Sequence, residues 1–221
     1  MCFSAEGSFV AGTGLLVAGA VAVRAVLPAR PRWLPLALLP VGFAVQQLAE
    51  GAVWLALRGT DPAAVRVPAL AFLFFSHGFW LFWVPFAVAL IEPGRFRRGL
   101  FAACAALGLG LGALMYVSIF AEHGFSVQVV KHSVDYGVKL ASDGIVPRDL
   151  VHGLYASVIL VPLLGTSNAR VRTFGVMVAA SMTLALLVFM YAFASIWCFM
   201  AAVLSVYVVK IVSDDARTLP V

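Results

Sequence analysis

A single carboxylate lies deep inside a long apolar run of this sequence. Gln46 and Trp54 precede and follow Glu50 at helical spacing, so the three side chains share one helix face, and Gln47 lies beside them. Ionisable groups are costly inside a membrane and mark functional sites there. A buried carboxyl group can act as a general base or couple its protonation to transport. We therefore predict a catalytic role for Glu50 and a pocket lined by its three neighbours. The alternative is a protonated Glu50 that only hydrogen-bonds a carbonyl or a glutamine.

A histidine occupies a second apolar run. His77 follows Ser76, and Trp80 lies three residues further on. Histidine transfers protons near neutral pH and binds Zn²⁺ or Cu²⁺. We predict that His77 is a second catalytic residue and a metal ligand, and that Ser76 and Trp80 line the pocket. The alternative is a histidine that only packs in the core.

Further candidate metal ligands lie near the ends of other apolar runs. They are Cys2, His132, His152 and Cys198. With His77 they would form a Zn- or Cu-type site that activates a water molecule. No CxxC or HxxxH spacing joins them, so this prediction rests on their expected proximity. For Cys2 and Cys198, a disulfide bond and an inert role remain open as alternatives.

The chain that carries these residues is far more apolar than a soluble protein. Hydrophobic residues make up 63% of its 221 residues, charged residues make up 11%, and the mean hydropathy is +1.03. Soluble domains carry about 25% charged residues. The net charge of +5 comes from basic residues that stand singly between apolar runs. The composition excludes a soluble enzyme, a disordered chain and a nucleic-acid-binding module.

Seven apolar runs are long enough to cross a membrane, which takes about 20 residues each. They are 8–28, 33–57, 68–91, 99–119, 149–165, 172–191 and 195–212. Residues 173–212 contain no strong break, but a helix of that length would be about twice as long as the bilayer core is thick. We therefore place a turn near Tyr191–Ser195. The prediction is an all-α membrane bundle that forms one domain over 1–221.

The polar stretch 120–148 is too long for a bare connection. Alternating apolar residues and several valines predict a short strand or hairpin in its middle. Such a hairpin can lie over the mouth of the bundle as a lid, and His132 and Tyr136 are its expected pocket-facing residues. The alternative is a solvated loop without a role.

The distribution of Lys and Arg predicts the orientation in the membrane. With seven spans, ten of these residues fall on the side of the C-terminus and five on the side of the N-terminus. Basic residues accumulate on the cytoplasmic side, so we expect the N-terminus outside and the C-terminus inside. Glu50 and His77 then lie at similar depths, roughly 10 and 13 Å from the outer ends of their helices. Trp197 falls on the same side, and we count it among the pocket residues.

Several segments resemble a bacterial family of multi-pass membrane proteins of unknown function. These segments are residues 1–5, the stretch 46–54, His132-Ser133 with nearby Tyr136, and Trp197-Cys198-Phe199. The resemblance supports the choice of these residues and implies no reaction. Seven spans with a buried histidine and carboxylate are also similar to the alkaline-ceramidase and adiponectin-receptor type of zinc hydrolase. The paired histidines of the last helix in that family are missing from this sequence, so the likeness concerns the fold alone.

The first functional hypothesis is a metal-dependent hydrolase in the plasma membrane. Its pocket lies in the outer half of the bilayer, its cofactor is Zn or Cu, and its substrate is a membrane lipid or another apolar molecule. The alternatives are a small-solute or ion transporter that uses Glu50 as its coupling carboxylate, and a non-catalytic subunit of a membrane complex. A haem protein would need a second histidine as deep as His77. The sequence identifies no protein partner.

Overall fold

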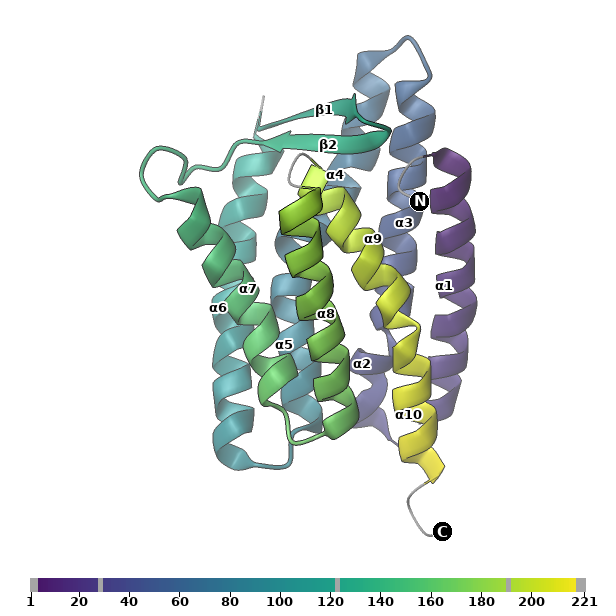
Figure 1. The fold of residues 1–221 in the computed structure, drawn as a ribbon, viewed down its shortest axis with the longest axis vertical. Helices are drawn as coiled ribbons and strands as arrows, with labels where there is room; N and C mark the ends of the chain where they lie inside the picture. Colours follow the sequence, from purple (N-terminus) through teal and green to yellow (C-terminus); the bar gives the residue numbers. More distant parts are fainter. Residues whose placement is uncertain (1–3, 28–29, 122–123, 190–191, 218–221) are drawn as a thin grey trace.

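The computed structural model describes residues 4–27, 30–121, 124–189 and 192–217. This part of the chain forms a helical bundle with one small hairpin across one end (Figure 1). It contains seven helical segments that are long and apolar enough to cross a membrane. The prediction of an all-α, seven-span bundle is therefore confirmed, and the chain is a multi-pass membrane protein.

Several spans consist of more than one helical piece. In chain order the pieces are α1 (Ala5–Val26); η1 (Pro31–Trp33), α2 (Leu34–Ala37) and α3 (Leu39–Leu57); η2 (Pro62–Val65), α4 (Arg66–Phe74), η3 (Phe75–Phe79) and α5 (Trp80–Ile91); α6 (Arg95–Phe120); α7 (Arg148–Gly165); α8 (Ala169–Val188); and α9 (Phe193–Ser205) with α10 (Tyr207–Arg217). The last two spans separate between Val188 and Phe193, where the sequence predicted a turn. Tyr191 itself lies outside the described residues.

Local sequence signals explain several helix ends. The Ser4 hydroxyl accepts a hydrogen bond from the Gly7 amide and caps α1. The Asn168 side chain accepts from the amides of Arg170 and Val171 and caps α8. Prolines stand at the starts of η1 and η2, where a missing amide proton costs no helical bond.

The loop predicted to contain a hairpin does contain one. Strands β1 (Phe125–Val130) and β2 (Ser133–Val138) pair in antiparallel register. Lys131 and His132 form the two-residue turn between them, and both have positive φ angles, of 46° and 62°. Tyr136 faces the bundle, where its ring stacks on Phe72 with 4.6 Å between centroids. The hairpin is thus packed onto the helices and is not a free loop.

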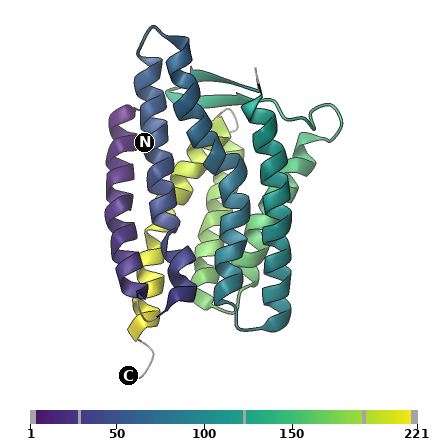
Figure 2. The same ribbon diagram turned by 180° about the vertical axis from the view of Figure 1, so that it is seen from behind.

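The span that contains the π-helical segment η3 packs beside α6 (Figure 2), and a close contact between two glycines fixes η3 there. A Cβ atom built on Gly112 of α6 would lie 2.8 Å from the carbonyl oxygen of Gly78 in η3. No side chain fits into that gap, so the two backbones touch directly. This contact sets the position of the residues next to Gly78.

Glu92 joins two connecting segments at the end of the bundle opposite the hairpin. Its carboxylate accepts hydrogen bonds from the hydroxyl of Thr166 and from the amide and hydroxyl of Ser167, at 2.6 to 3.0 Å. Burial opposes ionisation of Glu92, but these hydrogen bonds outweigh it and hold the pKa below its ordinary value. The ionised carboxylate ties the α5–α6 turn to the α7–α8 turn.

Candidate functional site

A cavity of about 540 Å³ lies between the hairpin and the nearby parts of η3, α7 and α9. Strand β2 forms one wall, and the start of α9 forms another. Much of its lining is polar or titratable: Ser76, His77, Asp135, Tyr136, Arg148, Asp149, His152, Tyr155, Ser195 and Cys198. A volume of this size holds a small organic molecule.

His77 enters this cavity from the π-helical turn η3. Such turns are rare and occur often at functional sites. The Ser76 hydroxyl lies 2.8 Å from Nδ1 of His77 and 3.4 Å from the carbonyl oxygen of Leu73. When Ser76 donates to Leu73, it accepts from Nδ1, and Nε2 keeps its lone pair. The Tyr155 hydroxyl donates to the Ser76 carbonyl at 2.6 Å, which holds this turn against α7.

His152 reaches the same cavity from α7. His77 and His152 thus line one cavity from two different spans. Its ring centroid lies 6.3 Å from that of Phe193. Nearby, hydrogen bonds from Arg148 lower the pKa of Asp143, and this ion pair closes the segment between β2 and α7.

Glu50 is fully buried behind the wall of the cavity. Its carboxylate accepts a hydrogen bond from Gln47 Nε2 at 3.3 Å and one from Ser195 Oγ at 2.5 Å. Ser195 itself lines the cavity. The Ser195 hydroxyl therefore links the carboxylate to the cavity, and Glu50 itself is not among the lining residues.

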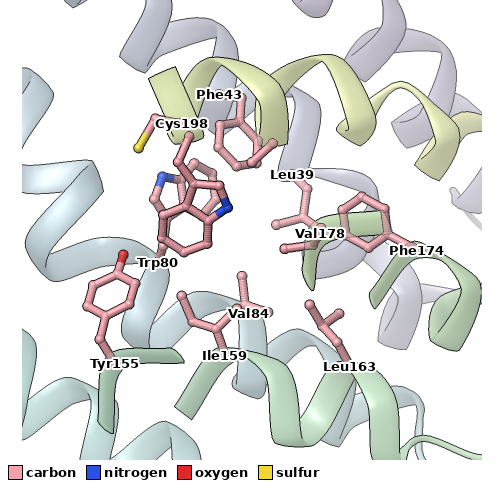
Figure 3. Close-up of a pocket in the computed structure, with 12 residues that line it drawn as sticks. Leu39, Phe43, Trp80, Val84, Tyr155, Ile159, Leu163, Phe174, Val178 and Cys198 are labelled. Atoms are coloured by element: carbon pink, nitrogen blue, oxygen red, sulfur yellow. The ribbon is translucent and has the colours of Figure 1, made fainter. Parts of the chain in front are cut away.

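A second, apolar cavity of about 40 Å³ shares part of its lining with the first, and Figure 3 shows the residues around it. Leu39, Val84, Ile159, Leu163 and Val178 are among its lining residues, and Figure 3 shows these aliphatic side chains around a common space. Three residues line both cavities: Tyr155, Trp197 and Cys198. A partly polar space and an apolar space thus adjoin at these three side chains.

The structure brings together six of the residues predicted from the sequence. Ser76, His77, Tyr136, His152, Trp197 and Cys198 all line the larger cavity. Trp80 lines the apolar cavity, and its indole donates to Gln46 Oε1 at 2.8 Å. Gln47 lies behind the wall with Glu50.

Two predicted residues lie away from the cavity, and a third falls outside the part of the chain that the structure describes. Trp54 packs in a buried cluster with Phe72 and Tyr136, below the hairpin. His132 is exposed at the tip of the hairpin and does not line the cavity. Cys2 lies outside the described residues.

A complete metal site is not visible in the described part of the chain. No group of three or more His, Cys, Asp or Glu residues lies there in a position to hold a metal ion. His77 and His152 are the two histidines that line the cavity. A Zn or Cu site therefore remains a prediction that needs a further ligand, and Cys2 was one of the candidates.

Sequence reasoning missed part of the lining. Tyr155 and Ser195 stand in apolar spans and carry hydroxyl groups, which was a usable signal. Arg148 and Asp149 precede a span, where charged residues are ordinary. The π-helical turn at η3 has no sequence signal that we can identify.

Comparison with known proteins gives a family and no activity. The model of a family of unknown function (DUF6629) matches residues 1–220. No curated protein and no solved structure matches the chain.

Proposed function

We propose that this chain, which belongs to the DUF6629 family, binds an amphipathic, lipid-like molecule beneath its hairpin and hydrolyses it. One observation carries the proposal. A cavity of about 540 Å³ with a partly polar lining and an apolar cavity of about 40 Å³ share the side chains of Tyr155, Trp197 and Cys198. The larger cavity has room for a small amphipathic molecule, and the apolar cavity has room for only a few atoms at the end of its chain.

The polar head and the apolar chain of the ligand would contact different kinds of side chain. Arg148, Asp149 and two histidines offer charges and hydrogen bonds to a polar head group. The aliphatic walls of the second cavity offer the end of an apolar chain an environment like the bilayer interior. Since most basic residues lie at the other end of the bundle, we place the hairpin and its cavity on the outer side of the plasma membrane.

His77 is the residue that we assign to the hydrolytic step. With Nδ1 bonded to Ser76, its Nε2 takes a proton from a water molecule whose oxygen attacks the acyl carbon. The bond between that carbon and the leaving oxygen then breaks, and the histidine returns the proton to the leaving alcohol. A bound Zn or Cu ion would lower the pKa of the attacking water.

Glu50 supports a second candidate function, a transporter. It is fully buried in a span, and Ser195 connects it to the cavity by a 2.5 Å hydrogen bond. A carboxylate in this position can take up a proton that enters through the cavity. Solute accumulation in vesicles that disappears in Glu50→Gln would support this function over hydrolysis. If the protein neither binds a lipid nor moves a solute, the non-catalytic subunit remains.

The proposal is tested by filling the apolar cavity. Ala201 lines this cavity and is 8% exposed, whereas Val203 on the same helix is 53% exposed. We expect Ala201→Phe to weaken binding of a fluorescent single-chain lipid at least about tenfold, or 1.4 kcal/mol. The matched variant Val203→Phe should bind as the wild type does. Equal affinity in all three proteins would overturn the proposal.

Two further variants separate folding and chemistry from binding. Ala201→Val adds less volume and should give a smaller loss in the same direction, which guards against a variant that fails to fold. His77→Ala should keep lipid binding and lose hydrolysis of an ester lipid. Retained hydrolysis in His77→Ala would remove the assigned role of His77.

A further inference from the structure

Four exposed arginines lie where α6 and α8 begin, at the end of the bundle opposite the hairpin (Figure 1). They are Arg95, Arg97, Arg98 and Arg172. Arg97 joins the two helix starts, because its Nη1 donates at 2.7 Å to the hydroxyl of Ser167, which directly precedes the cap of α8. The four guanidinium groups therefore belong to one surface, which we call the arginine patch.

Acidic side chains at this end do not balance the charge of the arginine patch. Glu92 is buried, and its carboxylate accepts hydrogen bonds from the α7–α8 turn. Asp214 lies 3.8 Å from Arg170, which is not part of the patch. These are the two acidic side chains that the structure describes at this end. Four guanidinium groups thus accompany one buried carboxylate, and the patch keeps a net positive charge.

The contacts that the patch makes with the protein are to neutral groups. Arg97 donates to a hydroxyl group, and Arg98 donates to the backbone carbonyl of Glu92 at 2.9 Å. Neither contact removes positive charge. Among the described residues, no hydrogen bond or ion pair engages Arg95 or Arg172. Their donors are available to a molecule that approaches from outside the protein.

An exposed aromatic side chain lies within the patch. Phe96 stands between two of the arginines and is 85% exposed, more than any other large hydrophobic side chain that the structure describes. Leu100, one helical turn further along α6, is 44% exposed. At a membrane interface, apolar side chains of this kind enter the acyl region while neighbouring basic groups stay at the level of the head groups. The patch therefore fits a lipid surface better than open water.

We infer that the arginine patch binds the phosphate group of an anionic membrane lipid. Guanidinium groups bind phosphate oxygens through paired N–H donors. Phe96 and Leu100 then lie where the acyl chains of that lipid begin. In the orientation proposed above, the patch faces the cytoplasmic leaflet, which carries anionic lipids. The inference does not depend on the proposed hydrolysis, because the patch and the cavity lie at opposite ends of the bundle (Figure 1).

Lipid retention tests the inference. Purified full-length protein would be equilibrated in micelles that hold equal amounts of phosphatidylglycerol and phosphatidylcholine, and native mass spectrometry would count the lipids that it retains. We expect the wild type to prefer phosphatidylglycerol at least about tenfold, since this lipid carries a net negative charge. Arg95→Gln and Arg172→Gln should each lower the preference about fivefold, which is the contribution of one basic residue near an anionic surface. Both variants should fold, because neither side chain has a described partner inside the protein.

Arg24→Gln is the matched control. Arg24 is also exposed at this end, but it lies on α1, on the other side of the bundle from α6 (Figures 1 and 2). It should keep the preference for phosphatidylglycerol. Equal retention of the two lipids by the wild type would overturn the inference, and so would an equal loss of preference in Arg24→Gln.

Two further arms separate this surface from other anion and lipid sites. Inorganic phosphate should not displace the retained phosphatidylglycerol, because it lacks the chains that contact Phe96. Complete displacement would show a site for soluble anions and would contradict lipid binding. Ala201→Phe, which fills the apolar cavity, should leave the preference for phosphatidylglycerol unchanged. If Ala201→Phe abolished that preference, the anionic lipid would be bound in the cavity and not at the arginine patch.

Discussion

The Ser195 hydroxyl donates a 2.5 Å hydrogen bond to Oε1 of Glu50 and thereby joins α9 to α3. Both side chains are fully buried. One end of this pair faces the cavity, since Ser195 lines it, and the other end lies in the core. Glu50 therefore positions the helix that carries Trp197 and Cys198.

Removing the hydroxyl of Ser195 should destabilise the protein. In Ser195→Ala, the Glu50 carboxyl group loses this donor in a buried place, which should lower the free energy of unfolding by about 1–3 kcal/mol. The measurement is unfolding in detergent, with Ser157→Ala as control because Ser157 is exposed and donates to the Gly153 carbonyl of its own helix. The double variant Glu50→Gln/Ser195→Ala should lose less free energy of unfolding than the sum of the losses in the two single variants. Full additivity would contradict the coupling of these residues.

The glycine contact between α6 and η3 predicts a position-specific effect on the cavity. Gly112→Val should push α6 away from the backbone of Gly78, lower stability by about 1–3 kcal/mol and weaken lipid binding, because His77 moves with η3. Gly110 on the same helix is exposed and has no heavy atom near the position of an added Cβ. Gly110→Val should therefore leave binding unchanged. Equal effects of the two substitutions on binding would show that the contact does not set the position of His77.

The lowered pKa of Glu92 predicts how the stability of the protein changes at acidic pH. Its pKa is held below its ordinary value in the folded protein, so its contribution is fully present above pH 4.5 and is lost as the pH falls through the lower folded value. Glu92→Gln should be less stable than the wild type at neutral pH, and the difference should shrink below that ordinary value. Melting temperatures measured from pH 7 down to pH 3 check this. If the two melting temperatures differ by the same amount over the whole pH range, the charge of Glu92 does not contribute to stability.

The metal prediction is tested by elemental analysis. If His77 and His152 share an ion with a further ligand such as Cys2, protein purified without chelators should carry about one Zn or Cu per chain, as metal sites of this type do. His77→Ala and His152→Ala should both lose it, and His132→Ala should retain it, because His132 lies outside the cavity. If the wild-type protein carries no metal, the hypothesis of a metal-dependent hydrolase is wrong.

The sequence predicted the fold better than the site. Span lengths and breaks follow directly from hydropathy, and the alternating residues around Val127 and Val129 predicted the strand that the hairpin contains. The side chains that meet in the cavity depend on helix rotation and on the π-helical turn at His77, which no local pattern encodes. Hydropathy marks Glu50 because it is a carboxylate inside an apolar span, but hydropathy does not show which way its helix faces. In the structure Glu50 lies behind the cavity wall, and its hydrogen-bond partner Ser195 lines the cavity.

The most direct test of lipid binding beneath the hairpin is photochemical labelling. A monoacylglycerol that carries a diazirine on its acyl chain would be bound to the full-length protein, irradiated, and the labelled peptides identified by mass spectrometry. We predict that the label concentrates on Ile159 and Trp197, which line the apolar cavity, and that unlabelled lipid competes it away. Label spread over exposed membrane-facing residues such as Leu114 and Val117, without competition, would contradict the account.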